Sequence, residues 1–243
     1  MLSKSQIKFI TSLQQKKYRQ QHQMFVAEGI KTIKELLNSS FELKELYTVE
    51  ALKSDAKQEH LITEAKLKKI SSLKTPNKAL AIFEIPNPQP VDTSKLIVAL
   101  DDVRDPGNLG TIIRLCDWFG VEHLVCSLNT VDCFNPKVVQ ATMGSITRVN
   151  VVYQDLKVFL KETETISFGA FMDGANVYSE KLPSQGILVM GNEANGISEQ
   201  VEQLIHKRIA IPRFGTLQQT ESLNVATATA ILLSEFKRFS TEK

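Results

Sequence analysis

The sequence predicts an α/β protein with two domains, a small one followed by a larger one built on a mostly parallel sheet with helices on both faces. Short apolar runs alternate with helical patterns after residue 90, as in parallel sheets whose strands are joined by helices. Three prolines within the segment IPNPQP, 85–90, mark a linker, because proline blocks helix interiors and central strands. The 243 residues are enough for two buried cores. We therefore expect domains at 1–90 and 91–243.

The small domain opens with an amphipathic helix. Ser3 can cap this helix, and Ile7, Ile10 and Leu13 share one of its faces. The later elements follow from apolar spacing. We expect a helix over 29–37, a strand over 41–49, a helix over 64–73 and a strand over 80–85.

The strands of the large domain are predicted by runs rich in Val, Ile and Leu. These runs cover 96–100, 123–126, 149–153, 166–172, 187–190 and 208–211. Helices are expected to start at Leu109 with Asn108 as the cap, near Ser198, and near Leu223 with Ser222 as the cap. Neither a G-x-G-x-x-G motif after a strand nor a Walker A motif is present, so ordinary dinucleotide and nucleotide triphosphate sites lose their main support.

Composition excludes several classes of protein. No run of eighteen apolar residues is present, and the first twenty residues lack the apolar core of a secretory signal. The three cysteines, Cys116, Cys126 and Cys133, have neither disulfide nor zinc spacing. We therefore expect a cytoplasmic protein with free thiols and no metal site.

The charge is distributed unevenly. Residues 1–90 carry 15 Lys and Arg against 9 Asp and Glu, and the remaining 153 residues carry 14 against 18. The first twenty residues contain five cations and no acid: Lys4, Lys8, Lys16, Lys17 and Arg19. A basic end favours a polyanion partner such as nucleic acid, although basic helices are also commonly just solvated faces.

Three loops after predicted strands carry the candidate chemistry, because open α/β sheets bind ligands at the carboxyl ends of strands. In the first, LDDVRDPGNLGTIIRLCDWFGV (100–121), Ile112, Leu115, Cys116 and Phe119 form the apolar face of a helix. Arg114 lies off that face. It is either a functional arginine or one half of a solvated pair with Asp117.

The second and third loops combine glycines with polar side chains. In MGNEANGIS (190–198), Gly191 and Gly196 permit a close backbone approach, while Glu193 would repel a phosphate. In TESLNVATATA (220–230), helix capping accounts for Ser222 but not for Glu221 and Asn224 as well.

In this order and spacing, the loops resemble the SpoU family of RNA 2′-O-ribose methyltransferases, which belongs to the SPOUT group. The matching segments are DPGNLGTIIR (105–114), FNPKVVQATMGSITRV (134–149), MGNEANGIS (190–198) and IP…ESLNVATATAILL (211–233). The resemblance covers 96–238, and 1–90 looks like the family's L30e-like RNA-binding domain, with FVAEG (25–29) as its best mark. One departure is PRFG at 212–215, where members often have P-Met-x-G.

The resemblance implies a C-terminal trefoil knot, S-adenosylmethionine as the cofactor, and a homodimer packed through the knot-domain helices. The residues implied to hold the cofactor are Leu188, Met190, Gly191, Ile211, Leu217, Ser222, Leu223 and Ala226. The residues implied to be catalytic are Asn108, Arg114, Glu193, Ser222 and Asn224. A charged Arg114 would grip a phosphate and orient the hydroxyl, because its pKa is above about 12. Glu193 and Asn224 would hold that arginine or accept the proton.

The implied substrate is RNA, with rRNA favoured over tRNA because an L30e-like domain accompanies many rRNA-directed members. Lys4, Lys8, Lys16, Lys17 and Arg19 would then contact phosphates. The alternative is a SpoU-fold RNA-binding protein without activity that acts in ribosome assembly. The full polar set argues against it, since a protein that only binds needs no such set.

Overall fold

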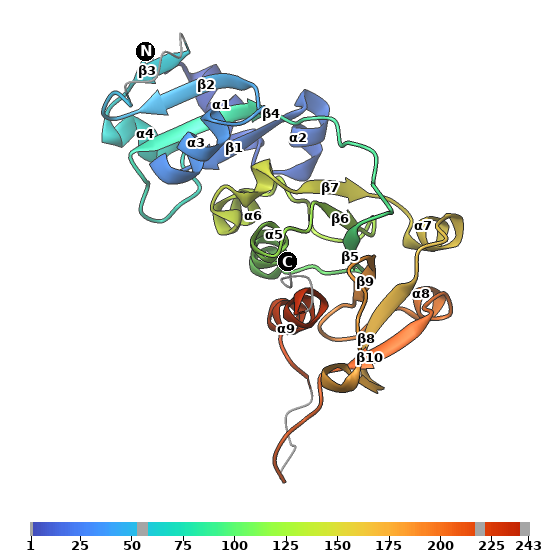
Figure 1. Cartoon of the computed structure of the whole chain (residues 1–243). Helices are drawn as coiled ribbons and strands as arrows, with labels where there is room; N and C mark the ends of the chain where they lie inside the picture. Colours follow the sequence, from blue (N-terminus) through green and yellow to red (C-terminus); the bar gives the residue numbers. More distant parts are fainter. Residues whose placement is uncertain (1, 53–57, 217–221, 239–243) are drawn as a thin grey trace. The chain divides into compact units, whose positions relative to one another are not determined.

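A computed structural model describes residues 2–52, 58–216 and 222–238, which fall into two compact units (Figure 1). The first unit contains Met1–Asn87 together with Asp132–Thr147, and the second contains Pro88–Val131 and Arg148–Lys243. The chain therefore returns to the first unit after it has begun the second. The predicted division into 1–90 and 91–243 did not include this return.

The first unit is a four-stranded sheet with helices. The strand order is β1-β4-β2-β3, in which β4 runs antiparallel to β1 and β2 while β3 is parallel to β2. The strands are β1 (Met24–Glu28), β2 (Leu43–Thr48), β3 (Glu59–Leu61) and β4 (Ala79–Glu84). The helices are α1 (Lys4–Ser12), α2 (Lys16–His22), α3 (Ile30–Leu37), α4 (Glu64–Ile70) and α6 (Pro136–Thr142), followed by a 3-10 turn, η1 (Ser145–Thr147).

The start of α1 is confirmed. The Ser3 hydroxyl accepts from the Gln6 amide, and the Gln6 side chain accepts from the Ser3 amide, which is a capping box. Ile10 and Leu13 are buried, as their spacing predicts. Helix α2 and strand β1 are not among the predicted elements, because KKYRQQH shows no apolar periodicity and MFVAE is short.

The second unit is a six-stranded sheet in the order β10-β8-β9-β5-β6-β7, and every paired strand is parallel to its neighbour. The predicted mostly parallel sheet is thus confirmed. The strands are β5 (Leu96–Leu100), β6 (His123–Cys126), β7 (Asn150–Tyr153), β8 (Ser167–Asn176), β9 (Gly186–Met190) and β10 (Lys207–Ala210). The helices are α5 (Pro106–Trp118), α7 (Leu156–Glu162), α8 (Glu199–Glu202) and α9 (Val225–Lys237), with a 3-10 turn, η2 (Val177–Ser179).

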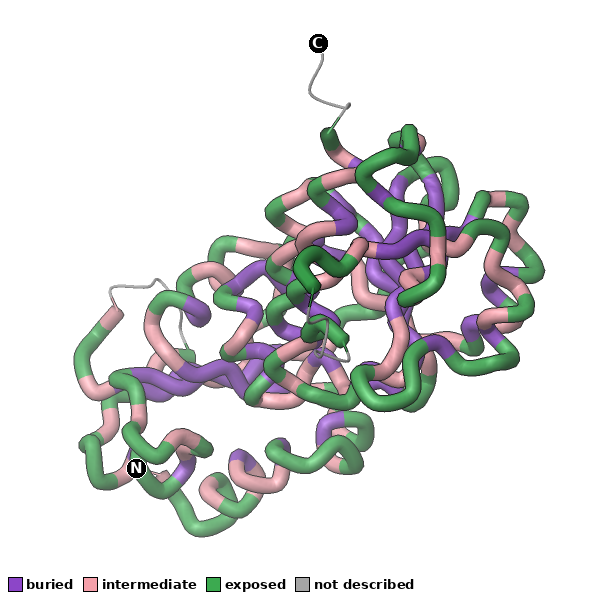
Figure 2. Tube along the Cα trace, turned by 90° about the horizontal axis from the view of Figure 1, so that it is seen from below, coloured by how far each residue is buried: buried purple, intermediate pink, exposed green. Residues whose placement is uncertain are grey.

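Helices cover both faces of this sheet, with α5 and α9 on one side and α7 and α8 on the other (Figure 1). Alternate residues of a strand face opposite sides. Ile97 and Ala99 of β5 accordingly pack with Phe159 and Leu160 of α7 and Val201 of α8. The strands form the buried centre, while loops and outer helix faces are exposed (Figure 2).

Two helix starts differ from the predictions. Helix α5 begins at Pro106, because the Asp105 carboxylate accepts from the Asn108 amide at 2.8 Å and so caps the helix three residues early. Helix α9 begins at Val225 with Asn224 as its cap, instead of at Leu223 with Ser222. In both cases the residue predicted to cap the helix, Asn108 or Ser222, does not do so, and its side chain can make other contacts.

Within the described residues the three cysteines form no disulfide, which agrees with the predicted thiols, and all three are buried. Burial raises the pKa of the Cys116 thiol to about 12, so it stays protonated at neutral pH and is a poor nucleophile. Within the described ranges, no helix combines the length and apolar character needed to cross a bilayer.

Candidate active site

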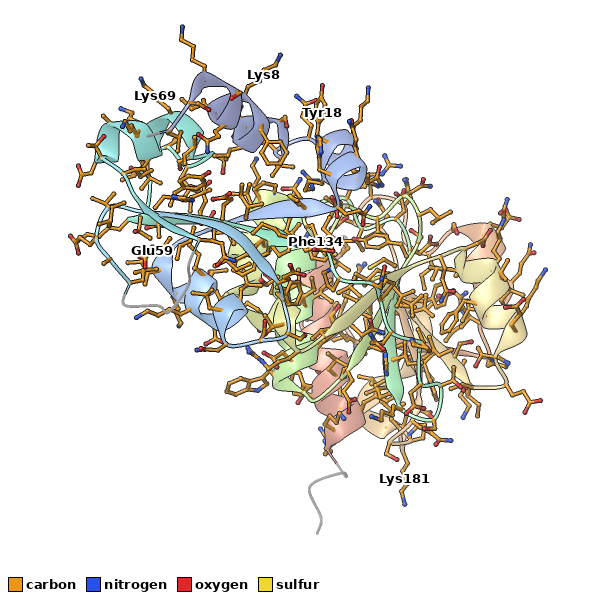
Figure 3. All side chains as sticks on the ribbon, turned by 90° about the horizontal axis from the view of Figure 1, so that it is seen from above. Lys8, Tyr18, Glu59, Lys69, Phe134 and Lys181 are labelled. Atoms are coloured by element: carbon orange, nitrogen blue, oxygen red, sulfur yellow. The ribbon has the colours of Figure 1, made fainter. Side chains whose placement is uncertain are left out.

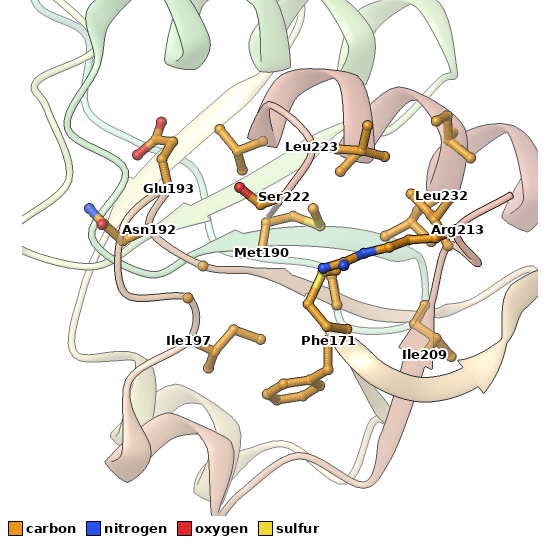
Figure 4. Close-up of a pocket in the computed structure, with 18 of the residues that line it drawn as sticks. Phe171, Met190, Asn192, Glu193, Ile197, Ile209, Arg213, Ser222, Leu223 and Leu232 are labelled. Carbon is orange, nitrogen blue, oxygen red and sulfur yellow. The ribbon is translucent and has the colours of Figure 1, made fainter. Parts of the chain in front are cut away.

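A pocket of about 1050 Å³ lies in the second unit, where β9 and β10 end (Figure 4). Its walls come from the loop after β9, the loop after β10, the first turns of α9 and the middle of β8. Strands of a parallel sheet end at the same edge, so loops distant in sequence meet there. The second and third candidate loops therefore converge on one cavity.

The loop after β9 is held in a tight bridge. A Cβ built on Gly191 would lie 2.2 Å from the carbonyl carbon of Gly196, so only glycine fits there. The amide of Asn192 donates to the carbonyl oxygen of Gly196 at 2.9 Å, and the side chain of Asn192 donates to the carbonyl of Asp102 at 2.7 Å. These bonds fix the backbone on which Glu193 stands.

The predicted cofactor residues divide into three groups. Five of them line the pocket: Met190, Gly191, Ile211, Ser222 and Leu223. Leu188 is fully buried in β9 and Ala226 is buried on α9, so they lie behind the lining. Leu217 lies outside the described residues, as does Glu221.

Three of the predicted catalytic residues form a hydrogen-bonded relay, which we call the amide relay. The Asn224 side-chain NH2 donates to the side-chain oxygen of Asn108 at 2.9 Å, and the Asn108 NH2 donates to a carboxylate oxygen of Glu193 at 2.6 Å. The Asn224 oxygen in turn accepts from the backbone amides of Ala226 and Thr227, which caps α9. The relay thus connects the starts of two helices to the pocket, because Glu193 belongs to both the relay and the lining.

Arg114 stands apart from the amide relay. It is exposed on α5, six residues after Asn108, which corresponds to about 9 Å along a helix axis. Within the described part of the chain its side chain has no hydrogen bond or ion pair, so neither Glu193 nor Asn224 holds it there. The alternative pairing with Asp117 is also wrong, because the Asp117 carboxylate accepts from Arg148 at 2.9–3.0 Å.

The basic N-terminal residues differ in their exposure. Lys4, Lys8, Lys16 and Lys17 are exposed, as phosphate contacts require. Arg19 is only 1% exposed, and its guanidinium donates to the Asp132 carboxylate and to the carbonyls of Leu13 and Gln14. The prediction that Arg19 contacts RNA is therefore wrong, because the side chain is buried and each of its three nitrogens donates a hydrogen bond inside the first unit.

Sequence reasoning assigned no role to part of the pocket wall. Arg213 extends its guanidinium into the pocket, which Phe171 also lines (Figure 4). Tyr178 is a further lining residue. The departure PRFG at 212–215 is the only sequence signal for Arg213. The lining residues of β8, 170–172, fall within the predicted strand 166–172, but nothing in their sequence marks them as a pocket wall.

Comparisons with known proteins place this site in a family. Residues 95–234 match the SpoU rRNA Methylase family, and residues 4–81 match the MRM3-like substrate binding domain. The chain is 29% identical to the 23S rRNA (guanosine(2553)-2′-O)-methyltransferase RlmP of Bacillus subtilis, with 91% of each chain covered.

Two solved structures are similar over nearly the whole chain. A TrmH-family protein from Porphyromonas gingivalis is 38% identical, with a TM-score of 0.89 and coverage of 98% of this chain and 99% of that one. An AdoMet-bound rRNA methyltransferase from Sinorhizobium meliloti is 28% identical, with a TM-score of 0.85 and coverage of 98% and 97%.

Proposed function

The chain belongs to the SpoU rRNA methylase family, and from this premise we propose that it transfers a methyl group from S-adenosylmethionine to a ribose 2′-hydroxyl of rRNA. The observation that carries the proposal is the position of Glu193, which faces the pocket and is held by the amide relay. A carboxylate fixed at the rim of a cofactor-sized cavity is suited to take a proton from a bound hydroxyl.

The pocket suits the cofactor in size and chemistry. Its volume of about 1050 Å³ is at the upper end of small-molecule sites. Apolar side chains of Met190, Ile211 and Leu223 would pack on the adenine and the methylene groups, and the bare backbone at Gly191 permits close approach. The guanidinium of Arg213 suits the carboxylate of the methionine part. The cofactor supplies a methyl group already activated by a sulfonium.

The chain's own contribution is positioning and proton transfer. Holding two reactants in line can supply roughly 7–11 kcal/mol of the barrier reduction. Asn108 orients one oxygen of Glu193, so the carboxylate would be placed to accept the 2′-hydroxyl proton. The methyl group would pass to the ribose oxygen as its bond to the sulfonium sulfur breaks, and the demethylated cofactor would leave as a neutral thioether. Both polar ends of the Asn224 amide are already bonded, so we assign it to positioning. Arg114 would grip a phosphate of the RNA.

The finer features follow from the same premise. The rRNA substrate is supported by the names of the relatives from B. subtilis and S. meliloti, and tRNA is the second choice. Lys4, Lys8, Lys16 and Lys17 would contact RNA phosphates. The C-terminal knot and the homodimer are proposed from the family resemblance, as is the cytoplasmic location. We therefore expect an enzyme that works as a pair of identical chains.

The test is methyl transfer from labelled S-adenosylmethionine to rRNA and tRNA pools from cells that lack the protein. We expect label in rRNA. Arg114→Lys should lower kcat/KM at least about ten-fold, and Arg114→Ala roughly a hundred-fold, because each loses the two-pronged grip on phosphate. Arg238→Ala, which changes the exposed arginine that caps the C-terminal end of α9, is the matched control and should behave as wild type.

Two results would contradict the proposal. Cofactor binding without transfer to either pool would favour an RNA-binding protein without activity. A failure to bind the cofactor at all would remove the enzyme assignment.

A further inference from the structure

Helices α1 and α4 of the first unit lie side by side on one face of its sheet. Ile10 and Leu13 from the α1 region share an apolar cluster with Leu67 and Ile70 of α4. The same cluster includes residues of the sheet face beneath them, Val26, Tyr47, Leu80 and Ile82. Because both helices bury one side on this face, their opposite sides form one continuous outer surface.

Lysines dominate that outer surface. Lys4 and Lys8 are exposed on α1, and Lys68 and Lys69 are exposed on α4, with the half-buried Lys66 beside them. Figure 3 shows Lys8 and Lys69 pointing away from the sheet on neighbouring helices. Glu64 is the only acidic residue on the two helices. We call these five lysines the lysine face.

The charges of the lysine face are not neutralised, in contrast to those of several other lysines of the chain. Lys44, Lys78 and Lys95 each form an ion pair with a glutamate. Across the described ranges, the five lysines of the lysine face have no ion pair. A cluster of unpaired like charges raises the free energy of the surface until an anion binds there.

The helix that carries most of these lysines is fixed at both ends. Thr63 caps the start of α4. At its end, the Glu28 carboxylate accepts from the Ser72 amide at 2.8 Å and from the hydroxyls of Ser71 and Ser72. Glu28 is only 7% exposed and stands at the end of β1, so α4 is tied to the sheet. A held helix presents its charges with little further ordering cost on binding.

We propose that the lysine face of α1 and α4 binds the phosphate backbone of the RNA substrate, with Lys66, Lys68 and Lys69 as contacts beyond the N-terminal lysines. This rests on the proposed RNA methyltransferase function. RNA is favoured over a protein partner, because protein interfaces are centred on apolar and aromatic side chains. Among the described residues, none of the large exposed apolar side chains lies on α1, α2 or α4. Lysines bind phosphates as point charges, so this surface supplies affinity and not base selection.

The experiment compares two double variants of the full-length chain. Lys68→Gln/Lys69→Gln removes two charges from α4, and Lys31→Gln/Lys34→Gln removes two exposed charges from α3 as the matched control. The dissociation constant for purified rRNA is measured by filter binding from about 50 to about 300 mM salt. Thermal unfolding checks that both variants fold. Cofactor binding and kcat at saturating rRNA are measured in parallel.

We expect the α4 variant to bind rRNA roughly ten-fold more weakly at about 0.1 M salt, with the slope of log affinity against log salt reduced by about 2. The α3 control should stay within about two-fold of wild type, and kcat at saturating rRNA should not change in either variant.

Wild-type affinity and slope in the α4 variant would overturn the proposal. Equal weakening in both variants would do so too, because it would show a general effect of net charge. The experiment distinguishes failure of the RNA-binding proposal from failure of the proposed enzymatic function. If wild type binds rRNA with the expected dependence on Lys68 and Lys69 yet transfers no methyl group, the lysine face stands and the enzymatic function does not.

Discussion

Polar groups of the two units of the chain illustrate two different roles. In the first unit, the polar groups with the most partners are internal: Arg19 is bonded to Asp132 and two carbonyls, and Glu28 to two serines. In the second unit, the relay residues Asn108, Glu193 and Asn224 lie near the surface where strands end. The first arrangement holds the fold together, whereas the second prepares a site.

Arg19 and Arg114 show the difference most clearly. Both are arginines that the sequence makes candidates for RNA contact. Arg19 is buried with all three of its side-chain nitrogens bonded within the protein, and Arg114 is exposed on α5. Charge alone therefore does not separate a structural arginine from a functional one. Changes at the first unit's internal groups should cost stability, and changes at the second unit's site should cost activity.

The largest expected effect is on stability, from Arg19→Ala. The change leaves the Asp132 carboxylate and two carbonyls without their donor, and breaking such a buried pair costs about 3–5 kcal/mol. Urea unfolding monitored by circular dichroism measures the loss. Arg19→Lys keeps the positive charge but not the planar guanidinium, so its unfolding free energy should lie between those of wild type and Arg19→Ala. A loss below about 1 kcal/mol would show that the contact is not structural.

The next effect is on activity, from Glu193→Gln. The amide keeps the size of the side chain but cannot accept a proton, so kcat should fall about a hundred-fold or more while the unfolding free energy stays the same. Single-turnover transfer at saturating rRNA measures the step. Glu199→Gln on α8 is the matched control. An unchanged kcat would assign the proton to another acceptor.

Asn224 combines a structural role with a role in the site, because it caps α9 and donates to Asn108. Asn224→Asp keeps the capping oxygen but loses the donor, so transfer should fall up to about ten-fold with little change in stability. Asn224→Ala should lose the same activity and about 1 kcal/mol of stability. Parallel melting and transfer assays separate the two roles. Full activity in Asn224→Asp would mean that the relay does not position Glu193.

The smallest effect is a pH dependence in the first unit. Burial, aided by the charge of Glu45, raises the pKa of Tyr47 from 10.0 to about 12. The unfolded chain therefore loses the phenol proton first, so stability should fall as pH rises from about 10 to about 12. Melting temperatures of wild type and Tyr47→Phe across this range test the sign. Identical curves for the two proteins would contradict it.

The sequence predicts the strands of the second unit well, because buried parallel strands are continuous apolar runs. The predicted bounds of β5 and β6 match the structure, and those of β9 differ by one residue. Helix starts are less predictable. Asp105 and Asn108 are both good caps, and their spacing does not show which one is used.

The contacts of the site depend on distances that a single sequence does not encode. Asn108 lies 85 residues from Glu193 and 116 from Asn224, so only the fold shows that their side chains bond. Arg19 fails as a prediction for the same reason, because its partner Asp132 is 113 residues away. Residue types identified the members of the site, while burial and pairing decided which of them remain available for ligands.

The return of residues 132–147 to the first unit also orders events during synthesis on the ribosome. Arg19 leaves the exit tunnel long before Asp132, and 113 residues at about 5–20 per second take roughly 6–23 seconds. During that interval the nascent N-terminal segment carries an arginine without its carboxylate, and Phe25 without Phe134, whose ring centroid lies 4.7 Å away in the finished protein. The first unit therefore cannot be completed until residues 132–147 have been made, after synthesis of the second unit has begun.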